Sequence, residues 1–162
     1  MKDGPPGLSL REGVEMGSSA NAMKWTTLFS SKSCEWDTPQ EVFDALDQEF
    51  RFELDVCAKK GHGKAIAFDM SENGLLKRWT PRVCWMNPPY GPELRMWMEK
   101  AYQESQNGAT VACLVPARTD TRWWHDYAML GEIRFIKGRL KFGGAKNSAP
   151  FPSAVVVFRP GR

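Results

Sequence analysis

The sequence predicts an α/β fold built on a mixed, mostly parallel sheet. Apolar runs typical of buried strands alternate along the chain with segments of helical spacing. Several of these runs stop at a proline or a polar residue, where a strand would enter a loop. Ligands bind beyond the carboxyl ends of the strands in such sheets. Polar residues at predicted strand ends are therefore the first candidates for function.

The first half of the fold is expected to begin with a helix that runs to Phe50. Asp37 or Thr38 can cap it, with Pro39 in its first turn, and apolar residues follow at helical spacing. Short strands are then expected at 52–57, with Asp55 near the strand end, and at 65–68, directly before Asp69. The Lys- and Gly-rich segment between them is expected to be a loop.

The second half is expected to alternate strands and helices more regularly. The run 82–86 stops at Asn87-Pro88-Pro89, and the run 110–115 stops at Pro116. An amphipathic helix is expected over 94–106, ended by Asn107-Gly108, and another over 119–130. Further strands are expected at 132–136 and 154–158, joined by a Gly-, Pro- and Lys-rich loop at 138–152.

Length and composition fit one globular domain, expected over 31–162. The chain has 162 residues, of which 42% are hydrophobic and 25% charged. Residues 1–30 are rich in Gly, Ser and Pro, and the segment 19–23 resembles an expression-vector remnant. We expect residues 1–30 to be disordered or vector-derived. Neither a membrane-spanning run nor a secretory signal is apparent, which predicts a cytosolic protein without a membrane partner.

Charge and cysteine content narrow the function classes. The formal net charge of +3 and pI of about 8.7 permit binding to nucleic acid without requiring it. The cysteines, Cys34, Cys57, Cys84 and Cys113, form no CxxC pair, and three lie in or beside apolar runs. Reduced, buried thiols are expected, and no metal site.

The loop Asn87-Pro88-Pro89-Tyr90 carries the most specific chemical signal. An exocyclic aromatic amine is a poor nucleophile because its lone pair is delocalised into the ring. The Asn87 side-chain oxygen and the Pro88 carbonyl can accept hydrogen bonds from both of its N–H groups, and two prolines fix these acceptors beforehand. Tyr90 offers an aromatic face to an extruded base. A plain turn is the alternative, since both dipeptides occur in ordinary turns.

With this loop as its centre, the chain resembles the phage-type DNA N6-adenine methyltransferase family. The resemblance implies a compact, shortened, Rossmann-like S-adenosylmethionine-dependent methyltransferase fold, with adenine in DNA as the substrate. It also implies a phage or prophage origin and action in the bacterial host cytoplasm. It rests on ordered blocks at 36–39, 53–58, 83–91, 114–121, 139–142 and 149–153.

Carboxylates at strand ends are the first candidates for binding the methyl donor. S-adenosylmethionine carries a sulfonium, an ammonium and a ribose, all of which suit acidic partners. Asp55 and Asp69 hold such positions, and a structural carboxylate that caps or pairs is the alternative for each. The resemblance adds further residues to the proposed donor pocket, namely Trp36, Thr38, Pro39, Cys57 and Ala58.

Basic and aromatic residues follow the predicted strands on the same edge. Such mixtures suit nucleic-acid strands, whose phosphates and bases they contact. Buried tryptophans and a solvated lysine face are the alternative. The candidates are Arg118, Arg122, Trp123 and Trp124 in one group, and Arg134, Lys137, Arg139, Lys141 and Lys146 in another.

Two other functions compete with this interpretation. A protein glutamine N5-methyltransferase uses the same loop on an amide nitrogen, but those proteins look longer and carry a fuller Gly-rich donor loop. A non-catalytic nucleic-acid-binding module is the second, and the intact Asn87 and Pro88 argue against it.

Overall fold

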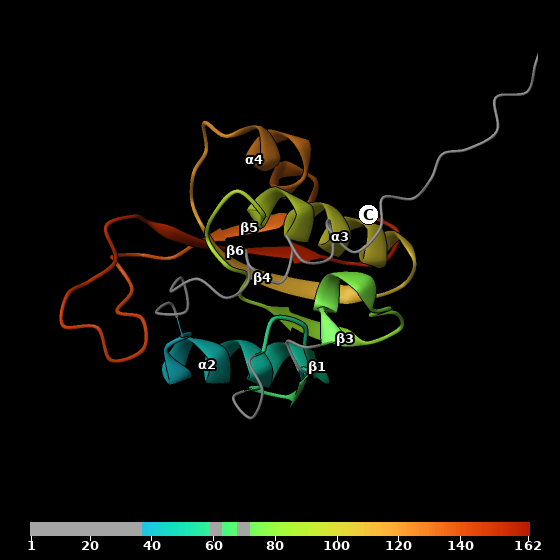
Figure 1. The fold of residues 1–162 in the computed structure, drawn as a ribbon, viewed down its shortest axis with the longest axis horizontal. Coiled ribbons are helices and arrows are strands. Elements are labelled where there is room, and N and C mark those ends of the chain that lie inside the picture. Colours follow the sequence, from blue (N-terminus) through green and yellow to red (C-terminus); the bar gives the residue numbers. More distant parts are fainter. Residues whose placement is uncertain (1–36, 59–62, 68–71) are drawn as a thin grey trace, which may run out of the picture. The chain divides into compact units, whose positions relative to one another are not determined.

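A six-stranded sheet organises the residues that the computed structural model describes, which are 37–58, 63–67 and 72–162 (Figure 1). Its strands lie in the order β2-β1-β3-β4-β6-β5. They are β1 (Leu54–Asp55), β2 (Ile66–Ala67), β3 (Val83–Met86), β4 (Thr110–Pro116), β5 (Glu132–Phe135) and β6 (Ser153–Phe158). The helices are α2 (Gln40–Phe50), α3 (Leu94–Gln106) and α4 (Arg122–Asp126), with 3-10 turns η2 (Gly74–Leu76) and η3 (Ala128–Leu130).

The sheet is parallel across β2, β1, β3 and β4, and β6 runs antiparallel to both β4 and β5. The carboxyl ends of β1, β3, β4 and β5 therefore point to one side, which we call the carboxyl edge. Strand β6 begins at this edge, where Ser153 pairs with Pro116 and Ala154 with Phe135. The mixed, mostly parallel sheet predicted from the sequence is confirmed.

Helices cover both faces of the sheet, with α2 on one side and α3 and α4 on the other (Figure 1). On the α2 side, Phe43 packs in a buried cluster with Trp85 and Leu114. Alternate residues of the same strands, such as Cys84 and Val111, are equally buried on the opposite side. Burial of both faces explains why these strands read as continuous apolar runs.

Most predicted elements occur, and the differences are local. The helix over 94–106 and the four later strands are confirmed within a residue or two. The strand expected at 52–57 is only Leu54–Asp55, and the helix expected over 119–130 is divided into α4 and η3 at Tyr127, whose φ is −130°. Residues 1–30, with the disorder predicted for them, lie outside the described residues. In the described part of the chain, no helix has the length and apolar character needed to cross a bilayer.

A buried carboxylate joins α3 to the segment that leads into β3. Glu104 Oε2 accepts hydrogen bonds from the backbone N–H groups of Trp79, at 3.0 Å, and Thr80, at 3.1 Å. Its other oxygen pairs with Lys100, whose ammonium also lies over the Trp79 ring. Burial acts to raise the pKa of Glu104, but the hydrogen bonds from Lys100 and the two backbone groups outweigh it, so the pKa is lowered.

Replacing Glu104 by Gln should destabilise the fold by about 2 kcal/mol, because charge-assisted hydrogen bonds are lost. The loss should depend on pH. The pKa of Glu104 in the folded chain lies below its ordinary value of 4.5, so its contribution is present above that pH and disappears as the pH falls through the folded value. Urea unfolding of both proteins across pH 3 to 7 measures this, with the exposed Glu41→Gln as control. A stability difference that does not change with pH would contradict the assignment.

Candidate active site

The parallel strands β1, β3 and β4 end beside one another at the carboxyl edge, where several polar residues predicted from the sequence to be functional lie. Asp55 at the end of β1 pairs with Trp85 of β3, and the Val56 N–H donates to the Trp85 carbonyl at 3.1 Å. Asn87 follows two residues after Trp85, so it lies level with Cys57. Burial raises the pKa of the Cys57 thiol well above its ordinary value, against a hydrogen bond from the Asn87 backbone N–H. The register of β1 against β3 therefore fixes Asn87 beside the end of β1.

The Asn87 side chain is held by a residue far away in sequence. Its Nδ2 donates to Thr38 Oγ1 at 2.9 Å, and the Thr38 side chain comes from the segment just before α2. Thr38 is only 6% exposed. This contact points the amide nitrogen at Thr38. Because the amide group is planar, its oxygen points away from Thr38.

The rest of the loop is rigid for identifiable reasons. Pro88 is buried and Pro89 half-buried, and each fixes its own φ. The Tyr90 hydroxyl donates to the Leu114 carbonyl of β4 at 3.2 Å. Burial raises the pKa of Tyr90 far above its ordinary value, so the group is a neutral donor at every physiological pH. The Tyr90 ring meets Phe142 and Phe151 edge-on, with centroids 6.1 Å and 5.5 Å away.

Asp55 is a buried carboxylate at the end of β1 and is 5% exposed. Its Oδ1 accepts from the Cys57 N–H at 3.2 Å and its Oδ2 from the Lys64 N–H at 3.1 Å. Burial raises the pKa of Asp55, although both backbone N–H groups act in the opposite direction. The side chain thus ties the turn after β1 to the segment that enters β2.

The remaining residues predicted for a donor pocket are distributed around this point. Pro39 is half-buried at the start of α2, Cys57 is half-buried and Ala58 is buried directly after β1. Trp36 and Asp69 lie outside the described residues. Asp55, Cys57, Thr38 and Asn87 are thus the predicted site residues that the structure brings together.

The predicted nucleic-acid residues divide into exposed cations and buried rings. Arg118, Arg139 and Lys141 are exposed in loops at the carboxyl edge, and Arg122 is exposed at the start of α4. The Ala117 N–H donates to the Pro152 carbonyl at 2.8 Å, which joins the loop after β4 to the loop 136–152. Trp123 is only 8% exposed and packs edge-on against Trp124, which stacks on Phe135. Arg134 is engaged in an ion pair, since both terminal nitrogens bind Glu49 of α2.

Comparison with known proteins decides the family. The family model described as DNA N-6-adenine-methyltransferase (Dam) matches residues 26–160. The chain belongs to this family. A DNA N-6-adenine-methyltransferase of Haemophilus phage HP1 (strain HP1c1) is 36% identical over 92 residues. That match covers 55% of this chain and 53% of the relative, so the chain matches about half the relative's length. The family predicted from the sequence blocks is confirmed.

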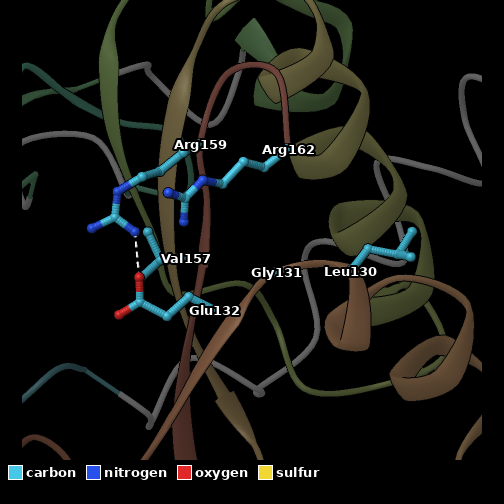
Figure 2. Close-up of a pocket in the computed structure, with 6 residues that line it drawn as sticks. All are labelled: Leu130, Gly131, Glu132, Val157, Arg159 and Arg162. Atoms are coloured by element: carbon cyan, nitrogen blue, oxygen red, sulfur yellow. Dashed lines mark hydrogen bonds and ion pairs between the residues drawn. The ribbon is translucent and has the colours of Figure 1, made fainter.

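A pocket elsewhere on this Dam-family chain is remote from the site. It has a volume of about 220 Å³ and is lined in part by Glu132, Val157 and Arg159 (Figure 2). Glu132 starts β5 and pairs with Val157 near the end of β6. The pocket therefore lies at the opposite edge of the sheet from Asn87, and Figure 2 shows Arg159 bound to Glu132 there.

Two features of the Dam-family site were not predicted from the sequence. One is the hydrogen bond between Thr38 and Asn87, which spans 49 positions. The other is the aromatic support under the loop, where Phe142 is 1% exposed although it follows the basic residues of a Gly-rich loop. Bulky apolar residues in such a loop are the signal that indicates an anchor.

Replacing Asp55 by Asn should destabilise the folded chain by roughly 1–3 kcal/mol, the usual result of leaving a buried donor unsatisfied. The amide retains one oxygen for two backbone N–H donors, and its NH₂ group would face one of them. Chemical denaturation measures the change. Asp44→Asn on the exposed side of α2 is the matched control. Equal stability of the Asp55 variant and the control would show that the two hydrogen bonds do not stabilise this turn.

Proposed function

We propose that this chain transfers a methyl group from S-adenosylmethionine to the exocyclic N6 of adenine in DNA. The observation that carries the proposal is the loop Asn87-Pro88-Pro89-Tyr90 at the carboxyl edge, with the Asn87 amide held against Thr38 and level with the turn after Asp55. The family to which the chain belongs supports the choice of adenine and of its N6 nitrogen.

The proposed chemistry follows from the acceptors in the loop. Asn87 Oδ1 and the Pro88 carbonyl accept the two N–H groups of the amine, which draws its nitrogen toward tetrahedral geometry and builds lone-pair density on one side. Both acceptors are neutral and fixed before the substrate arrives. The amine becomes acidic once it is methylated, so its proton leaves to solvent and a dedicated general base is not required.

The chain offers donor-binding groups of suitable chemistry next to this loop. When bound, S-adenosylmethionine supplies an electrophilic methyl carbon on a sulfonium. Asp55 is a buried carboxylate at the end of β1, which suits a cationic ligand carrying hydroxyl groups. We assign Asp55, Cys57, Ala58 and Pro39 to this pocket, with Trp36 and Asp69 as further candidates from outside the described residues; Thr38, expected there by resemblance, binds Asn87 instead.

The strand arrangement supports a shortened Rossmann-like methyltransferase fold. The parallel strands β2, β1, β3 and β4, with the antiparallel β6 inserted before β5, bring the end of β1 at Asp55 and the loop that begins at Asn87 to one edge. Such an edge is where ligands bind in open α/β sheets. Residues 31–162 would then form one methyltransferase domain.

Exposed cations around the site provide the proposed DNA contacts. Reaching adenine in a duplex requires flipping the base out, which costs a few kcal/mol that phosphate and stacking contacts must offset. Arg118, Arg122, Arg139 and Lys141 suit the phosphates, and Tyr90 suits the base. Trp123 would act by supporting the short helix α4 that carries Arg122.

Asn87→Ala should lower kcat for adenine methylation by at least about a hundredfold, the usual effect of removing one preorganised transition-state contact. Donor affinity should be retained, because the amide faces the amine and not the donor. Incubation with labelled donor and unmethylated DNA, followed by nucleoside analysis, reports the activity, the base and the position together. The exposed Asn107→Ala is the control.

Two results would contradict this assignment. Wild-type turnover by Asn87→Ala would remove the mechanism. Label transferred to a protein glutamine amide in preference to DNA would favour the amide methyltransferase instead.

Arg118→Ala and Arg139→Ala should each raise the DNA KM and reduce the slope of log affinity against log salt by about one, as expected when one phosphate contact is lost. Arg162→Ala at the opposite edge of the sheet removes the same charge and should leave the slope unchanged. Fluorescence titrations with duplex DNA at several salt concentrations measure the slopes. Equal slopes for all three variants would mean that DNA does not bind at the carboxyl edge.

A further inference from the structure

We propose that Thr38 is a positioning residue, which holds the Asn87 amide with its oxygen toward the reacting amine. The inference rests on the proposed function and assigns a different role to a residue placed in the donor pocket by resemblance. Thr38 Oγ1 accepts the hydrogen bond from Asn87 Nδ2 at 2.9 Å.

The orientation of this amide decides whether the loop can activate an amine. An Asn side chain has an acceptor and a donor on opposite branches of one planar group. A half-turn of the amide would present NH₂ to the amine of the substrate, and two donors would then face each other. In the structure the buried Thr38 hydroxyl accepts from the nitrogen, and this bond holds the amide in the orientation in which the oxygen is presented.

Thr38 is itself fixed from both sides. On its N-terminal side, the Asp37 carbonyl accepts from the Gly143 N–H at 2.9 Å. On its C-terminal side, the Pro39 carbonyl accepts from Val42 and Phe43 and so begins α2. The short segment before the helix is therefore held between α2 and the loop 136–152.

Gly143 makes this approach possible because it lacks a side chain. A Cβ atom at this position would lie 2.7 Å from Asp37 Cβ, closer than real Cβ contacts come. The adjacent Phe142 is buried in the core beside Tyr90 and anchors the loop. The loop 136–152 and the Asn87 amide are thus joined through Gly143, Asp37 and Thr38.

The decisive comparison is Thr38→Val against Thr38→Ser in the full chain. Valine keeps the shape and removes the acceptor, whereas serine keeps the acceptor and removes the methyl group. Thr38→Val should lower kcat roughly tenfold, the size expected for one hydrogen bond that sets transition-state geometry. The KM for DNA and the donor affinity measured by calorimetry should stay at the wild-type value, and Thr38→Ser should recover most of kcat.

A second readout does not depend on activity. The ¹⁵N side-chain amide signal of Asn87 should shift and exchange with solvent faster in Thr38→Val than in the wild type or Thr38→Ser. Because this signal reports the amide directly, it tests the inference even if the wild-type chain fails to methylate adenine. Absence of methylation by the wild type would overturn the proposed function, whereas an unaltered Asn87 signal in Thr38→Val would overturn the role of Thr38.

Other results would also overturn the role. They are wild-type kcat in Thr38→Val, a Thr38→Ser variant as slow as Thr38→Val, and a loss of donor affinity that accounts for the whole change in rate.

Gly143→Ala offers an independent test, made at the other end of the series of contacts that leads to Asn87. It should displace Asp37 and perturb the same Asn87 signal, with Ser148→Ala in the exposed part of the loop as control. An unperturbed signal in Gly143→Ala would contradict the coupling to the loop.

Discussion

The pairing of β1 with β3 is the constraint on which the site depends. Two residues of β1 suffice, because Asp55 is aligned with Trp85 and the next backbone hydrogen bond continues the ladder to Val56. This alignment brings the turn that follows Asp55 level with Asn87. A shift of one residue in either strand would turn the side chains to the opposite face and separate the carboxylate from the amide. The register is protected by the buried Trp85, which Phe43 and Phe52 pack against on the α2 side.

Around this alignment, backbone groups bind two of the polar side chains that the chain buries near the site. Asp55 is bound by two backbone N–H groups, and Tyr90 is bound to a carbonyl of β4. The Asn87 amide differs, since a side-chain hydroxyl from a distant segment holds its nitrogen. A neutral, preorganised acceptor suits the activation of an amine near a cationic donor, because it brings no charge that must be desolvated.

The sequence was sufficient to predict most of the fold and the central loop. Strands such as 83–86 and 110–116 are buried on both faces, so they read as uninterrupted apolar runs, which stop at Asn87-Pro88 and at Pro116. The length of β1 was overestimated because Phe52 is apolar yet packs outside the strand pairing, against Phe50 and Phe43. The burial of Trp123 and the ion pair of Arg134 could not be predicted, since both depend on tertiary contacts. Trp123 packs against Trp124, which stacks on Phe135, and Arg134 binds Glu49 of α2. The contact of Thr38 with Asn87 is likewise tertiary, with no local pattern to indicate it.

The most direct test of the account is a crystal structure of the full chain with S-adenosylhomocysteine and a DNA duplex that contains the target adenine. The account predicts that adenine N6 lies about 3 Å from both Asn87 Oδ1 and the Pro88 carbonyl. It also predicts that the sulfur of the bound homocysteine is nearest the open side of N6, with Asp55 behind it. An adenine ring seated away from this loop, or an Asn87 amide that presents its nitrogen to N6, would contradict the central claim.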